Sequence, residues 1–129
     1  GLVGFYKDFG SVDRIEVRAQ GSNNSANARF EVVNTNSSVV SMYSNSIAHS
    51  GIGINKNNKY AFAFKGNYYA GVVNGGSAQT DTSGNVPTGL NGMIVGNSVY
   101  TVRSHLYIKR LTLYSQRLSN NQLQNLTSW

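Results

Sequence analysis

The chain has little of what stabilises or anchors many small proteins. Its 129 residues include no cysteine and only one proline, so disulfide bonds are excluded and the redox compartment is left open. No apolar run approaches the roughly twenty residues that span a bilayer, and no signal peptide is visible. We therefore expect no membrane insertion. Because the chain opens on Gly1 rather than Met, we expect it to be the C-terminal part of a longer protein.

Acidic side chains are scarce as well, with five Asp and Glu against eleven Lys and Arg. The resulting formal charge of +6 fits anionic partners such as acidic polysaccharide or lipopolysaccharide. Nucleic-acid-binding proteins usually gather their basic residues in one patch or stripe, whereas here only Lys109 and Arg110 are adjacent. We therefore predict no nucleic-acid partner.

The few carboxylates limit the enzyme classes that the chain can support. Glycoside hydrolysis normally needs two of them beside the substrate, and no Glu-x-Asp-x-x-Glu run is present. Glu16 and Glu31 alternate with apolar neighbours, so both are predicted to face solvent as ordinary strand charges. No Gly-x-Ser-x-Gly motif occurs, and His49 and His105 have no Cys, His or carboxylate at ligand spacing. We predict no enzyme activity, no catalytic residue, no metal site and no cofactor.

A calcium site is possible at Asp81, because this carboxylate is flanked by the hydroxyls of Thr80, Thr82 and Ser83. The alternative to a calcium site is an Asx turn, in which the Asp81 carboxylate accepts backbone N–H groups. Calcium takes about six to eight oxygen ligands, and only one carboxylate is at hand here. We favour the Asx turn and leave the calcium site open.

What the chain does contain is a series of short alternating segments. Polar and apolar residues alternate over 14–19, 29–32 and 59–65, with the period of two that is typical of half-buried strands. Leu2 to Tyr6 supplies one further short strand that can pair back onto the sheet. Loops rich in Gly, Asn and Ser are predicted over 21–27, 34–38, 50–58 and 82–91. We predict one all-β domain over residues 1–129, with antiparallel strands arranged as a sandwich or barrel.

The end of the chain is predicted to form a long strand over 105–114, a connector over 115–118 and a short helix. Ser119 and Gln122 have the spacing of a capping box, and Leu118, Leu123 and Leu126 supply an apolar stripe for the helix. The strand changes phase, since its apolar residues at 106 and 108 lie on the opposite face from those at 111 and 113. We predict a β-bulge near residues 109 and 110, or a strand covered on both faces there.

These elements occur in the order found in one family of viral proteins. The run from His105 to Thr127 is preceded by a Val73-Asn74-Gly75-Gly76 hairpin, by Thr80-Asp81-Thr82-Ser83 with Val86-Pro87, and by Ile94-Val95-Gly96. The chain thereby resembles concanavalin A/laminin-G-like jelly-roll domains of bacteriophage structural proteins. The resemblance implies an antiparallel jelly-roll β-sandwich of the concanavalin A-like lectin/glucanase type with a short C-terminal α-helix.

The same resemblance implies a non-enzymatic module at the virion surface, in a tail fibre, tail spike or head decoration. Such a module would bind carbohydrate on the host cell, such as surface polysaccharide or lipopolysaccharide. One alternative is a purely structural module that packs against other virion subunits or forms a homo-oligomer. A second alternative is a divergent glycosidase.

Eight tyrosines offer chemistry for a saccharide site, because their rings are flat and apolar and end in a polar hydroxyl. Tyr60 and Tyr114 are predicted to be used in packing. Tyr68 and Tyr69 are adjacent and must point to opposite faces of a strand, so at most one of them lies in the core. The candidate glycan-binding surface consists of Tyr43, Asn67, Tyr69, Asn74, Tyr100 and Arg103.

Overall fold

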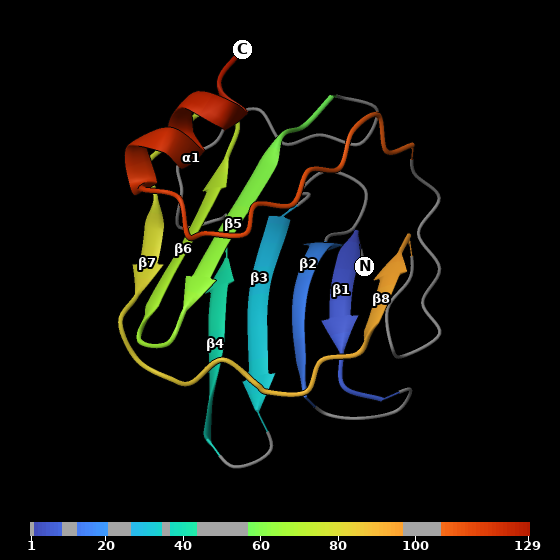
Figure 1. Ribbon diagram of the computed structural model, residues 1–129. Helices are drawn as coiled ribbons and strands as arrows, with labels where there is room; N and C mark the ends of the chain where they lie inside the picture. Colours follow the sequence, from blue (N-terminus) through green and yellow to red (C-terminus); the bar gives the residue numbers. More distant parts are fainter. Residues whose placement is uncertain (1, 9–12, 21–26, 35–36, 44–56, 97–106) are drawn as a thin grey trace.

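The structure is a computed structural model that describes residues 2–8, 13–20, 27–34, 37–43, 57–96 and 107–129. In this part of the chain, eight strands form two antiparallel sheets and one short helix lies near the C-terminal end (Figure 1). The five-stranded sheet has the order β4-β3-β2-β1-β8, and the three-stranded sheet has the order β5-β6-β7. The elements are β1 (Val3–Tyr6), β2 (Arg14–Gln20), β3 (Asn27–Asn34), β4 (Ser37–Tyr43), β5 (Tyr60–Lys65), β6 (Tyr68–Val73), β7 (Gln79–Asp81), β8 (Gly92–Val95) and α1 (Asn120–Thr127).

The alternation in the N-terminal half places apolar side chains on one face of the five-stranded sheet. Ile15 of β2 lies opposite Val32 of β3, and Val17 lies opposite Phe30. This face packs against the three-stranded sheet, and the core between the sheets consists of Ile15, Ala28, Phe30, Val32, Val40, Met42, Tyr69 and Val73. The short N-terminal strand pairs with both β2 and β8. Two packed antiparallel sheets with one C-terminal helix agree with the predicted all-β sandwich.

A glycine brings the two sheets into close contact at the centre of this core. A Cβ atom at Gly71 of β6 would lie 2.4 Å from Cδ2 of Phe30, far closer than two carbon atoms can approach. The ring of Phe30 therefore occupies space that any other residue at position 71 would need. Its centroid also lies 5.3 Å from that of Phe62 on β5, at a tilted angle typical of packed aromatic pairs.

The helix covers the outer face of the three-stranded sheet. Leu123 is buried against Ala63 of β5 and against Ala70 and Val72 of β6. The predicted capping box is present: Gln122 donates its backbone N–H to Oγ of Ser119 at 3.3 Å, and Ser119 donates its own to Oε1 of Gln122 at 2.8 Å. The predicted helix is confirmed. Among the described residues, no helix has the length and apolar character needed to cross a membrane.

Hydrogen bonds also fasten α1 to the turn that follows β6. The backbone N–H of Gly75 donates to Oγ1 of Thr127, and the side-chain amide of Gln124 donates to the carbonyl of Gly76, both at 3.0 Å. Because Thr127 is itself buried, breaking these bonds would leave a buried polar group without a hydrogen-bond partner, which costs free energy. These bonds hold the C-terminal part of α1 against the three-stranded sheet.

The predicted long strand is wrong for the residues that the structure describes, which begin at 107. Residues 107–114 form no ladder with any described strand, and Ile108, Leu111 and Leu113 are exposed. Figure 1 draws this segment as an extended coil that leads to α1. The phase change explains the difference, because no single face of a strand could bury both apolar sets and two charged residues separate them. The bulge predicted near Lys109 and Arg110 needs a paired strand, so it is not formed either.

Candidate functional site

The structure places the predicted binding residues in different parts of the molecule. Asn67 precedes β6 and Asn74 follows it, so these two amides lie at opposite ends of one strand. Both have positive φ angles, 59° and 50°, which asparagine tolerates in tight turns. Tyr43 is the last residue of β4, in the other sheet, and Tyr100 and Arg103 lie outside the described residues. The described members of the predicted surface therefore do not meet in one site.

Tyr69 is buried, which corrects its placement on an exposed surface. Its side chain is 1 % exposed, lies in the core between the sheets and donates its hydroxyl to the carbonyl of Gly84 at 3.0 Å. The neighbouring Tyr68 is 60 % exposed. The two rings point to opposite faces of β6, as the strand geometry predicts, and Tyr69 is the one that is buried in the core.

Asn74 is similarly committed to local structure. Its Oδ1 accepts the backbone N–H of Lys59 at 2.8 Å, and its Nδ2 donates to Oδ1 of Asn58 at 3.1 Å. These bonds join the start of β5 to the end of β6 and occupy both ends of the carboxamide. The Asn74 side chain thus serves the sheet rather than a ligand.

The buried Tyr69 leads to a prediction about alkaline pH. Burial raises the pKa of its hydroxyl above the ordinary value of about 10, and the charge of Asp81 on β7 raises that pKa further. The native state therefore keeps this proton where the unfolded chain releases it, so the stabilisation is complete below about pH 10 and is lost as the pH rises further. We expect the free energy of unfolding to fall above about pH 10, and to fall less steeply in Tyr69→Phe.

Urea denaturation at a series of alkaline pH values measures this slope. Tyr68→Phe is the matched control, because it removes the neighbouring hydroxyl from an exposed ring. Equal slopes for Tyr69→Phe and the unchanged protein would show that the Tyr69 hydroxyl titrates alike in the native and unfolded states.

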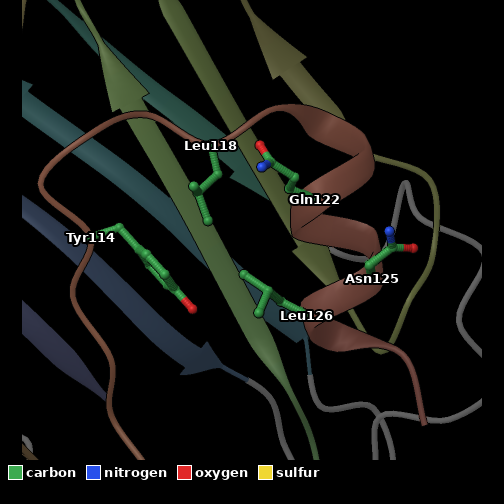
Figure 2. A pocket seen from close by; sticks show the side chains of 5 residues that line it. All are labelled: Tyr114, Leu118, Gln122, Asn125 and Leu126. Atoms are coloured by element: carbon green, nitrogen blue, oxygen red, sulfur yellow. The ribbon is translucent and has the colours of Figure 1, made fainter.

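A groove lies between the segment that precedes α1 and the helix itself (Figure 2). Its volume is about 350 Å³, and its lining residues are Tyr114, Leu118, Gln122, Asn125 and Leu126. Leu118 packs against the apolar cluster under α1, whereas Tyr114 is 51 % exposed. In Figure 2 the Tyr114 ring stands across β5 from the helix, with Leu118 and Leu126 between them.

The walls of the groove combine an aromatic ring with side-chain amides. Oε1 of Gln122 is held by the capping box, which leaves its NH₂ group available. The Asn125 carboxamide makes no hydrogen bond to any described residue. A flat apolar ring opposite free amide donors and acceptors suits a ligand that has both C–H faces and hydroxyl groups.

Sequence reasoning assigned none of these five groove residues to a site. Tyr114 was predicted to be packed, and that prediction is wrong because its segment leaves the sheets. Leu126 belongs to the predicted apolar stripe of the helix, but it is exposed at the groove, whereas Leu123 is buried. The one available signal was the capping box, which fixed the helix start and with it the positions of Gln122 and Asn125.

The two strand glutamates contradict the prediction that they face solvent. Glu16 is 0 % exposed and Glu31 is 3 % exposed, and they lie opposite each other on β2 and β3. Oε2 of Glu31 lies 3.0 Å from Nη2 of Arg14 and also contacts Arg18, and Oε1 lies 2.7 Å from Nη2 of Arg29. Oε2 of Glu16 lies 3.4 Å from Nε of both Arg14 and Arg18. The arginines neutralise two carboxylates that would otherwise repel each other on a buried face.

The Asx turn at Asp81 is confirmed. Oδ1 of Asp81 accepts both the backbone N–H and the hydroxyl of Ser83, each at 2.8 Å. Among the described residues, no group of three or more His, Cys, Asp or Glu side chains comes together.

No family model, no curated protein and no solved structure matches the chain.

Proposed function

We propose that this protein is a non-enzymatic carbohydrate-binding module of a bacteriophage virion, and that the saccharide binds in the groove beside α1. The observation that carries the proposal is a half-exposed Tyr114 ring facing the helix amides of Gln122 and Asn125 across a space of about 350 Å³. A sugar ring stacks its C–H face on an aromatic side chain and offers hydroxyls to amides. The virion setting and the host-surface ligand rest on the resemblance of the chain to phage structural domains.

A jelly-roll arrangement of the strands belongs to the same proposal. After passing through β5, β6 and β7, the chain returns with β8 to lie beside β1. A late strand that returns by a long connection to pair with the first is typical of Greek-key sandwiches, of which jelly rolls are built. This connection supports the jelly-roll type.

Replacing Tyr114 tests the saccharide site. A glycan array of bacterial surface saccharides identifies a ligand, and titration calorimetry then measures its dissociation constant. We expect Tyr114→Ala to weaken binding by about tenfold to thirtyfold, because a central aromatic contact is worth roughly 2 kcal/mol in a binding site. Tyr107→Ala is the matched control, since it removes a fully exposed tyrosine of the same segment outside the groove. Equal affinities of Tyr114→Ala and the unchanged protein would refute the proposed site.

A structural module is the second candidate, and the exposed apolar residues of 107–114 favour it. Tyr107, Ile108, Leu111 and Leu113 are exposed along one short segment. Soluble domains rarely expose large contiguous apolar patches unless another molecule covers them. Binding to no bacterial saccharide, together with retention in assembled particles, would favour this candidate over the lectin.

The glycosidase alternative has no support among the described residues. The groove is lined by no carboxylate, and Glu16 and Glu31 are buried and bound to arginines. Hydrolysis of a glycosidic bond needs two carboxyl groups that flank the substrate.

A further inference from the structure

On the five-stranded sheet much of the positive charge is neutralised, whereas the segment that leads to the groove carries only positive charge. Three of the eleven basic residues, Arg14, Arg18 and Arg29, are held by Glu16 and Glu31. The chain has no Asp or Glu after Asp81. Every formal charge in the segment and helix that form the groove is therefore positive.

One of these charges belongs to Arg117, which is next to a lining residue of the groove and is held by hydrogen bonds. Arg117 precedes the lining residue Leu118, and its Nη1 donates to the Leu118 carbonyl at 2.9 Å. Its Nη2 donates to Oδ1 of Asn120 at 3.0 Å, and its guanidinium carbon lies 5.7 Å from the ring centroid of Tyr68. Among the described residues, no carboxylate forms an ion pair with Arg117. The guanidinium is thus held in place without a counter-charge.

Tyr68 and Lys65 extend the same surface. They lie opposite each other on β6 and β5, so they share a face of the sheet. This is the face covered by α1, because Ala63, two residues before Lys65, and Ala70, two residues after Tyr68, pack under the helix. Both Tyr68 and Lys65 are exposed. The Tyr68 ring therefore meets Arg117 beside Leu118, and Lys65 lies next to Tyr68 on the same face of the sheet.

From this arrangement we propose that Arg117 and Tyr68 form an anion-binding subsite next to the groove, and that the ligand is an acidic saccharide. The inference rests on the proposed function and specifies its ligand class. Each Nη nitrogen of Arg117 has a second N–H, and a carboxylate or phosphate accepts such a pair in a bidentate manner. The Tyr68 ring supports the guanidinium, and Lys65 adds a second positive charge. The sugar unit that carries the acid group binds here, and the neighbouring unit stacks on Tyr114.

The test compares three oligosaccharides of equal length on the same protein: one with a carboxylate, one with a phosphate and one neutral. Titration calorimetry is expected to give about tenfold tighter binding of at least one acidic ligand than of the neutral one, since a hydrogen bond to a charged group contributes about that factor. The better of the two acidic ligands identifies the anionic group. The advantage should shrink when salt is raised from about 0.01 to 0.1 M, because screening shortens the reach of the charges.

Two variants locate the subsite. Arg117→Gln should remove the tenfold preference for the acidic ligand and leave the affinity for the neutral one within about twofold. Arg110→Gln is the matched control, because it removes an exposed charge of the same chain segment that does not line the groove. Arg117→Lys keeps the charge but loses the planar fork, so it should recover only part of the preference. Circular dichroism verifies that each variant is folded.

The possible results separate the two levels of the proposal. If neutral and acidic ligands bind equally, or if Arg110→Gln and Arg117→Gln have the same effect, the subsite is refuted while the groove stands. If no saccharide binds, the proposed function fails and the subsite fails with it. A single-stranded oligonucleotide that binds as tightly as the acidic saccharide, and loses affinity in Arg117→Gln, would instead make this surface a nucleic-acid site. If a variant does not fold, the comparison of acidic and neutral ligands on the unchanged protein still tests the proposal, because equal affinities refute it.

Discussion

Replacing Glu31 by alanine is expected to lower the free energy of unfolding by about 3–5 kcal/mol, measured by chemical denaturation. The Glu31 carboxylate contacts Arg14, Arg18 and Arg29 on a buried face of the five-stranded sheet. Without it, three guanidinium groups remain close together with only Glu16 to balance them. Removing one partner of a buried ion pair leaves an uncompensated charge away from water, which is why the loss is large. A domain of this size has a total stability of about 5–15 kcal/mol, so the loss should be a substantial part of it.

Asp8→Ala is the matched control for this experiment. Asp8 is exposed, and its Oδ1 accepts a single hydrogen bond from Nδ2 of Asn91 at 3.2 Å. Removing it should change the free energy of unfolding by less than about 1 kcal/mol. If Glu31→Ala is as mild as Asp8→Ala, the network of arginines and glutamates does not stabilise the sheet as described.

The second large effect is expected for Phe30→Ala, which should cost about 3–5 kcal/mol of folding free energy. The Phe30 ring is fully buried between the sheets and lies against Phe62 and the backbone of Gly71. Removing it leaves a cavity at the centre of the core, because the surrounding strands cannot collapse into the space. Urea denaturation of the variant and of the unchanged protein gives the difference.

Gly71→Ala tests the same contact from the other sheet. In the unchanged protein it should destabilise the fold by about 1–3 kcal/mol, because the new Cβ overlaps the Phe30 ring. In the Phe30→Ala background the methyl group enters the cavity, so the cost should largely disappear. Gly66→Ala is the control, since a Cβ at Gly66 has no neighbour within 4 Å. Additive effects of the two substitutions would contradict the close approach of Gly71 and Phe30.

Local patterns predicted the parts of the fold that depend on local physics. The alternation at Ile15 and Val17, and at Phe30 and Val32, predicted strands and their buried face. Ser119 and Gln122 predicted the helix start, because a capping box involves only residues three apart. Strand alternation and capping boxes can be predicted without knowing which residues pack against the other side of the sheet.

The features that sequence reasoning missed depend on contacts between distant parts of the chain. Glu16 and Glu31 were assigned to solvent because alternation shows which face a residue is on, but not whether that face is covered. The spacing of Arg14, Glu16 and Arg18 was the available signal, since side chains two apart on a strand share a face and can form ion pairs.

The groove was missed for a related reason. Tyr114 was treated as part of a paired strand, and its exposure follows from the path of the whole segment 107–118 toward α1. Gln122 and Asn125 meet Tyr114 only because Leu118 and Leu123 hold the connector and the helix against the three-stranded sheet. No residue spacing in the sequence predicts that these three side chains lie together.

Mapping the bound ligand on the protein shows whether a saccharide binds in the groove beside α1. Backbone amide signals of the isotope-labelled chain are recorded by nuclear magnetic resonance during titration with a bacterial surface oligosaccharide. We expect shifts at Tyr114, Leu118 and the α1 residues Gln122 and Asn125, with no comparable change in β2 or β3. Shifts centred on β2 and β3, or none at the groove while the ligand binds, would contradict it.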